Sequence, residues 1–386
     1  MSSSLRTALV AALALSALAA SAAAQGSLAV QGFGYPPGQL SSRSLTTGGA
    51  TGEMDHLSPL NPATLLGLGG ATLYFQAEPE FRKVSVPGGE ASTTTARYPL
   101  VFGGFQPKAR WAFALSSSTL ADRSWQTTLD TLEQIAGDTA RSSTTYRSEG
   151  AINDLRLGVA YGANSWLRLG LGLHAFSGRN RILVGRNFTD DRFADFGDTS
   201  TISYGGNAIS VGAEMRVQRV ASLALSARKG GRMSARTSAG DSTLGRGDVP
   251  DRIAASAAYL GLANSIIAVR VAQEKWSNLQ GLGTPSLQPH DVTDIGVGAD
   301  IAGPRFGSRV IMVRVGGRWR DLPFAVPSAT GVAAEVRETS FAGGLGTLLA
   351  GGRAGVDLGL VRASRTSSLD ATERAWILSV GLTVRP

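Results

Sequence analysis

The feature that most constrains this chain is the length of the connectors between its β-like segments. Fourteen segments between Ala71 and the C-terminus show the period-two alternation of apolar and polar residues that half-buried β-strands show. Short connectors follow the even-numbered segments and longer ones follow the odd-numbered segments, with the connector at 365–370 as the exception. Turns that are short at one end and long at the other indicate the antiparallel strands of a transmembrane β-barrel.

The predicted strands are approximately 71–83, 96–105, 109–118, 144–162, 165–177, 200–217, 221–230, 251–261, 264–275, 291–302, 308–321, 334–349, 352–364 and 371–385. The alternation is clearest at 166–174, where every odd-numbered residue is leucine. A soluble β-sandwich also alternates, but its connectors have no two-sided bias in length. We therefore predict an all-β fold, a transmembrane antiparallel β-barrel of about 14 strands.

The N-terminus carries the pattern of an export signal. Arg6 precedes an apolar run at 8–20, and small residues at 21–24 form a cleavage-like site. A membrane anchor is the alternative, but the run is shorter than the roughly 20 residues that span a bilayer. The chain has no cysteine, which excludes a disulfide framework and thiolate metal sites. We expect residues 1–24 to be a signal peptide and the mature protein to reach the Gram-negative outer membrane.

The stretch between the signal peptide and the first strand is the second informative part. Residues 25–70 lack alternation and are rich in Gly, Pro, Ser and Thr. A barrel of about fourteen strands leaves a lumen that water, side chains or a plug must fill. We predict that residues 25–70 form an N-terminal plug inside a barrel made by residues 71–386.

Charged residues lie on the strand faces opposite the leucines and valines, so the lumen is predicted to be lined by mixed charges. Most of these charges are expected to pair across the barrel. Arg156, Arg168, Arg314 and Arg318 are our candidates for contact with an anionic head group, because a guanidinium binds carboxylates and phosphates well. The formal charge of +8 does not indicate nucleic-acid binding, since the arginines are spread singly along strands of an exported chain.

Asn61, Pro62 and Ala63 stand in the N-terminal segment, directly before the fourteen predicted strands. In this the chain resembles the FadL/TodX family of outer-membrane transporters for long-chain fatty acids and other hydrophobic compounds. It also resembles the PorV-like barrels, which serve protein secretion. The FadL/TodX resemblance implies a hatch inside the barrel, hydrophobic ligand pockets and lateral release through the wall. The family's wall kink lies in the third strand, which here has no glycine, so the sequence does not place the opening.

The expected function is passage of hydrophobic or amphipathic, fatty-acid-like molecules across the outer membrane. We expect a monomer surrounded by outer-membrane lipid, with a hydrophobic or anionic amphipathic ligand, no cofactor, no metal and no nucleic acid. A general porin for polar solutes and a PorV-like secretion barrel are the alternatives. An enzyme is not expected, because His56, His174 and His290 are the only histidines and no hydrolase, zinc-protease or P-loop motif is present.

Two local predictions complete the analysis. Apolar residues recur at three- and four-residue spacing within 127–140, which predicts a short amphipathic helix in the longest loop; they are Leu129, Leu132, Ile135 and Ala136. Aromatic residues stand near the strand ends, as two interfacial girdles require. Those near short connectors are Trp111, Tyr161, Trp166 and Tyr259, and those beside long loops are Trp276 and Trp319.

Overall fold

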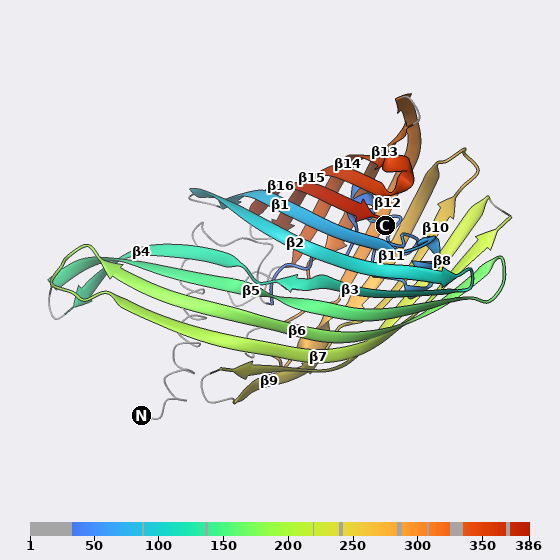
Figure 1. Cartoon of the computed structure of the whole chain (residues 1–386). Coiled ribbons are helices and arrows are strands. Elements are labelled where there is room, and N and C mark those ends of the chain that lie inside the picture. The colour runs from blue at the N-terminus through green and yellow to red at the C-terminus, as the bar shows by residue number, and fades with distance from the viewer. Residues whose placement is uncertain are drawn as a thin grey trace.

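The computed structural model describes residues 33–86, 89–135, 138–218, 220–238, 242–283, 288–306, 309–324, 335–367 and 371–386. Within these ranges sixteen strands form a single sheet, and every pairing in it is antiparallel. The first strand pairs with the last, which closes the sheet into the barrel of Figure 1. The predicted signal peptide lies outside the described residues.

The strands of the sheet, in chain order, are β1 (Thr72–Val86), β2 (Gly89–Lys108), β3 (Trp111–Asp122), β4 (Trp125–Ile135), β5 (Asp138–Gly162), β6 (Leu167–Phe188), β7 (Phe196–Val217), β8 (Ala221–Thr237), β9 (Thr243–Asp248), β10 (Asp251–Tyr259), β11 (Ile266–Lys275), β12 (Val292–Phe306), β13 (Arg309–Asp321), β14 (Val336–Leu349), β15 (Ala354–Ser367) and β16 (Thr372–Val384). β4 pairs only with β5, and β9 pairs only with β8. The other fourteen strands make the closed wall, which confirms the predicted fold class.

The two ends of the barrel differ as predicted. Short connectors join β2 to β3, β5 to β6 and β7 to β8 at one end, which we call the short-turn end. At the other end, the long-loop end, strands continue well past the predicted boundaries, so that much of 178–199 belongs to β6 and β7. These extensions are rich in Ser, Thr, Arg and Gly, and Ile182, Leu183 and Val184 follow one another without alternation, so the period-two pattern gives little signal there.

The helix predicted within 127–140 is wrong. Residues 125–135 form β4, which pairs continuously with the first part of β5 and lies beside it at the far left of Figure 1. The stretch contains several threonines, whose β-branched side chains favour strands, and β5 offers a complete ladder partner. Cross-strand pairing therefore outweighs the helical spacing of the leucines.

β9 was also missed, and a proline explains its separation from β10. Both strands pair with β8 in one continuous register, with Arg232 opposite Asp248 and Arg228 opposite Arg252. Between them stands Pro250, which has no backbone N–H to donate to the ladder. Opposite this break, the Gly230 N–H donates to the Asp251 side chain at 2.8 Å.

The outer surface of the wall is apolar. Leu169, Leu171 and Leu173 point outward and are about half exposed, as the alternation predicted. A continuous apolar belt of this kind is suited to a bilayer rather than to water. Of the aromatic residues, Trp111, Trp166, Tyr259 and Trp319 are also exposed on this surface. Trp276 was wrongly placed there, since it is 1% exposed and packs edge-on against Phe324 inside the barrel. The described residues contain no helix long and apolar enough to cross a membrane.

The N-terminal segment from residue 33 to residue 70 crosses the lumen. Its short helix α2 (Ser42–Thr46) is capped by the Ser41 side chain and contacts β13, β14, β15 and β16. Its 3₁₀-helix η2 (Pro62–Gly67) contacts β2, β3, β5, β6 and β7. These two groups of strands occupy different arcs of the closed sheet. The segment therefore touches much of the inner wall, and most of its residues are buried.

Candidate functional site

Toward the long-loop end, the inner face of the barrel holds an apolar cluster in place of the charges found elsewhere. We call it the luminal apolar cluster. It consists of Phe33, Leu120, Ala121, Ile152, Phe176, Tyr204, Ala208, Met233, Ala235, Val249, Trp276, Leu279, Leu282, Val292 and Phe324. Phe33 comes from the N-terminal segment, and the others come from the wall and its loops. A porin lumen is polar at this depth, so the cluster marks a region suited to apolar molecules.

Two arginines without an ion-pair partner in the described structure lie against this cluster. Arg228 lies over the Phe176 ring at 5.7 Å, and Arg123 has more unsatisfied donors. The guanidinium of Arg123 lies 5.2 Å from the ring centroid of Phe33 and 5.1 Å from that of Tyr204. Its Nε and Nη1 atoms are buried and have no hydrogen-bond partner among the described residues. Contact with ring faces offsets part of the cost of burying a cation, but it leaves the N–H groups unsatisfied. The site therefore offers donors to an anionic group at the edge of an apolar surface.

The four arginines predicted as ligand contacts all lie in the lumen, but three are ion-paired. Arg168 pairs with Glu214 at 2.9 Å. Arg314 pairs with Asp357 at 2.5 Å, and Arg318 pairs with Asp294 at 2.8 Å.

The fourth, Arg156, donates to the carbonyl oxygen of Pro59 in the N-terminal segment at 2.5 Å. The four residues come from β5, β6 and β13 and share no common partner among the described contacts. Sequence reasoning missed Arg123, because its two aromatic neighbours come from distant parts of the chain.

Asn61, Pro62 and Ala63 dock on the inner faces of β6 and β7. The Asn61 side chain caps η2 by accepting from the Ala63 N–H at 3.0 Å, and it donates to the Ala213 carbonyl of β7 at 3.3 Å. Two glycines of the wall make room for this turn. A Cβ at Gly212 would lie 1.9 Å from the Asn61 Oδ1 atom, and a Cβ at Gly170 would lie 2.3 Å from the Ala63 nitrogen.

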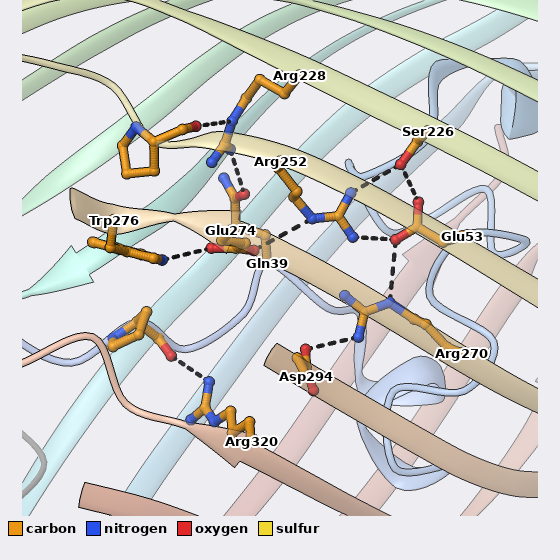
Figure 2. A network of polar contacts seen from close by, with 12 residues as sticks. Gln39, Glu53, Ser226, Arg228, Arg252, Arg270, Glu274, Trp276, Asp294 and Arg320 are labelled. Atoms are coloured by element: carbon orange, nitrogen blue, oxygen red, sulfur yellow. Dashed lines mark hydrogen bonds and ion pairs between the residues drawn. The ribbon is translucent and has the colours of Figure 1, made fainter. Parts of the chain in front are cut away.

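Glu53 is the main charged anchor of the segment (Figure 2). Its carboxylate contacts Arg252, accepts from Ser226 Oγ at 2.6 Å and lies 3.2 Å from Arg270 Nε. Burial alone would raise the pKa of the Glu53 carboxyl, but the two guanidinium groups lower that pKa to about 2. Glu53 is therefore ionised at neutral pH and ties the segment to β8, β10 and β11.

A second polar chain links the segment to β5, β6 and β7, the next strands along the wall from β8. His174 Nδ1 lies 2.9 Å from Asp154 Oδ1, and His174 Nε2 lies 2.8 Å from Ser210 Oγ. Asp154 also accepts from the Gln39 amide of the segment at 3.0 Å. The order of groups matches a hydrolytic triad, but Ser210 is buried and the N-terminal segment covers this part of the wall. In this structure the polar chain holds Gln39 through the carboxylate of Asp154.

The ladder between β2 and β3 stops before the long-loop end. Among the described residues, β2 pairs with β3 only from Leu100 to Lys108. β3 bulges after Thr119, and its last three residues are all buried, which turns its end into the lumen. There Asp122 exchanges two main-chain hydrogen bonds of 2.8 Å with Tyr35, and its carboxylate accepts from Arg97 of β2 at 2.5 Å. Side chains and the N-terminal segment thus bridge β2 and β3 where the ladder ends.

A resident metal has no candidate site in the described parts of the chain, where no group of three or more His, Asp and Glu side chains comes together. His56 and His290 lie apart from the His174 chain and each keeps a buried Nε2 atom without a partner in the described structure.

No family model matches this sequence, and no curated protein sequence matches it either. Solved structures do match. The monoaromatic hydrocarbon channel CymD aligns over 90% of this chain and 97% of its own, with a TM-score of 0.57 and 14% identity. A FadL homologue from Pseudomonas aeruginosa aligns over 92% and 99% of the two chains, with a TM-score of 0.59 and 12% identity. The toluene transporter TodX of Pseudomonas putida aligns over 93% and 100%, with a TM-score of 0.56 and 13% identity.

The chain has the FadL/TodX fold. At this level of identity the likeness extends to the architecture of nearly the whole chain and not to individual side chains. One local feature of the wall is read from this chain alone, the interruption at the end of the β2–β3 ladder. It is produced by a bulge after Thr119 and by pairing with Tyr35, without a glycine in β3.

Proposed function

We propose that this protein lets hydrophobic and anionic amphipathic molecules cross the outer membrane. The observation that carries the proposal is the luminal apolar cluster, which has no use in a pore for polar solutes. The neighbours of known structure include a monoaromatic hydrocarbon channel and a toluene transporter, which agrees with an apolar cargo. No energy source is evident in the chain, so transport would follow the concentration gradient.

We further propose that residues 25–70 are the plug of this barrel, after removal of residues 1–24 as a signal peptide, and that the protein acts as a monomer in the outer membrane. Glu53, Gln39 and Asn61 attach the described part of this segment to different strands. Since these contacts are polar and internal, they can be exchanged for water or ligand contacts when the segment moves. Movement of the plug would connect the luminal apolar cluster to the rest of the lumen.

The cargo is expected to include molecules with an anionic head group, because Arg123 offers unsatisfied N–H donors beside the cluster. An acyl chain would lie against rings such as Phe176 and Trp276, and its carboxylate would reach the guanidinium. Charge-assisted hydrogen bonds of this kind contribute about 1.5–3 kcal/mol. We propose Arg123 as a further head-group contact beside the expected candidates Arg156, Arg168, Arg314 and Arg318, of which Arg168, Arg314 and Arg318 are ion-paired in this structure.

Replacing Arg123 by leucine is expected to reduce uptake of a radiolabelled long-chain fatty acid by roughly tenfold, because about 1.4 kcal/mol of binding is a factor of ten. Uptake of a neutral aromatic hydrocarbon by the same cells should stay unchanged. The matched control is Arg362→Leu, which removes an arginine that stacks on Trp376 at 4.9 Å. Equal losses for both compounds would show that Arg123 does not select for charge.

The exit we propose is lateral, at the end of the β2–β3 ladder. Tyr98 of β2 lies just beyond the last paired residue and is 65% exposed, so its side chain borders any molecule that leaves there. The Arg97–Asp122 ion pair and the Tyr35 main chain close this point in the present structure.

A photoreactive amino acid at position 98 is therefore expected to cross-link a radiolabelled hydrophobic cargo during uptake. The control places the same amino acid at Tyr259, which is also exposed but stands at the short-turn end of β10. Cargo that merely dissolves in the membrane would label both positions alike. Equal labelling of positions 98 and 259 would contradict a lateral exit between β2 and β3.

A further inference from the structure

Three guanidinium groups surround the ring of Tyr35, which belongs to the N-terminal segment. We propose that this cage is a binding site for phenolic molecules, and that the chain's own Tyr35 occupies it until such a molecule replaces it. The consequence of binding rests on the proposed function, since displacement of the Tyr35 ring would open the barrel. The binding itself can be measured without any transport.

The geometry of the cage is that of a receptor for a phenol. The centroid of the Tyr35 ring lies 4.8 Å from the Arg97 guanidinium, 4.9 Å from that of Arg320 and 4.5 Å from that of Arg365. Cations at this distance from an aromatic ring are attracted to its face. The hydroxyl donates to Glu338 Oε2 at 3.0 Å and also contacts the Arg320 guanidinium. The ring and the hydroxyl are thus both recognised.

The wall supplies a carboxylate partner for every guanidinium of the cage, although Arg320 also contacts the Tyr35 hydroxyl and donates to the Pro36 carbonyl at 2.7 Å. Arg97 pairs with Glu80 and with Asp122, and its Nε atom lies 2.5 Å from Asp122 Oδ2. Arg320 pairs with Glu338 at 2.7 Å. Arg365 lies 2.6 Å from Glu338 and 2.8 Å from Glu80. Because each guanidinium has a carboxylate partner on a strand, the site remains formed when the ring leaves.

A phenol cannot enter beside Tyr35 and must take its place. The cavity that borders Tyr35, Arg97 and Glu338 has a volume of about 10 Å³, which is room for one water molecule. Displacement of the ring would pull on the main chain of Tyr35, which holds Asp122 at the end of β3. A phenol would thereby loosen the point where the β2–β3 ladder ends.

The test is chemical rescue in the purified full-length protein. Tyr35→Ala removes the ring and leaves a hole of phenol size in the cage. Millimolar phenol is expected to raise the thermal unfolding midpoint of Tyr35→Ala by several degrees, because a ligand that binds only the folded state stabilises it. Cyclohexanol has a similar size and a hydroxyl but no aromatic face, so it should have little effect. Tyr35→Phe keeps a ring that phenol must first displace, so its unfolding midpoint should rise less with phenol than that of Tyr35→Ala.

A second measurement uses the unchanged protein in planar bilayers. Phenol, but not cyclohexanol, is expected to increase ion conductance, because it releases the segment at Tyr35. Equal effects of the two compounds on Tyr35→Ala, or no effect of either, would overturn the binding site. If Tyr35→Ala does not fold, the bilayer result decides, and unchanged conductance with phenol overturns the proposal. Rescue of Tyr35→Ala without a change in wild-type conductance would overturn the displacement step, whatever the result of uptake experiments.

Discussion

Replacing Glu53 by glutamine is expected to turn a closed barrel into an ion-conducting pore. The change leaves Arg252 without its closest carboxylate, and Arg270 keeps only Asp294 at 2.8 Å. Breaking a buried ion pair costs about 3–5 kcal/mol, and the remaining partners of both arginines place this case near the lower limit. That loss falls on the attachment of the N-terminal segment, so conductance in planar bilayers should rise well above that of the wild type.

The control for this variant is Glu149→Gln. Glu149 pairs with Arg147 on the surface, where both side chains are about half exposed, and such pairs contribute about 0–1 kcal/mol. Its conductance should match the wild type. Lowered conductance or an unchanged trace for Glu53→Gln would show that Glu53 does not hold the segment. The ionised Glu53 carboxylate stabilises the attachment of the N-terminal segment in full above its ordinary pKa of 4.5, and this stabilisation is lost as the pH falls through about 2. The wild-type conductance should therefore stay low at neutral pH.

A steric variant tests the same attachment at a different strand. Gly212→Ala places a Cβ within 1.9 Å of Asn61, which must move away from β7. Gly205→Ala is the matched control, because it lies on the same strand and its Cβ would meet nothing within 4 Å. Higher conductance for Gly212→Ala alone is the expected result. Similar behaviour of the two alanine variants would contradict docking of Asn61 at this place.

Replacing Arg365 by methionine is expected to be the most destabilising single change in the barrel. Arg365 is fully buried on β15, and its guanidinium contacts Glu80 of β1, Glu338 of β14 and Glu373 of β16. It therefore clamps the place where β1 and β16 close the sheet. Methionine has a similar length but no charge, so Glu80 and Glu338 each lose one buried arginine partner and keep Arg97 and Arg320 respectively. A loss of about 3–5 kcal/mol in the free energy of unfolding follows.

Urea unfolding in lipid vesicles measures this effect. Arg362→Met is the control on the same strand, because Arg362 faces outward and stacks on Trp376. That cation–π contact contributes about 0.5–1 kcal/mol. A difference of less than about 1 kcal/mol between the two variants would mean that the charge cluster does not stabilise the closure of the barrel.

Much of the architecture follows from the chemistry of single strands. A face such as Leu169, Leu171 and Leu173 has no place in a water-soluble sheet with this connector pattern, so the barrel and its fourteen wall strands could be predicted. The extensions at the long-loop end could not, because they stand outside the bilayer and need no apolar face. β4 is the clearest case, since its leucine spacing resembles a helix and only pairing with β5 makes it a strand.

The candidate site was less accessible to sequence reasoning. That arginines would line the lumen follows from alternation, but which of them are neutralised depends on partners far along the chain. Arg318 of β13 finds Asp294 on the neighbouring strand β12, and Arg314 finds Asp357 on β15, two strands away. Arg123 is left without a carboxylate by the same geometry, and its sequence neighbourhood gives no sign of this. Trp276 faces inward because the chain leaves the wall after β11.

The central claim is that the barrel holds apolar molecules in its lumen at the long-loop end. Native mass spectrometry of the protein, extracted gently from outer membranes, tests it most directly. The account predicts a retained hydrophobic or amphipathic small molecule in the wild type and less of an anionic one in Arg123→Leu. It would be contradicted if no apolar molecule is ever retained and if deletion of the protein leaves the uptake of hydrophobic compounds unchanged.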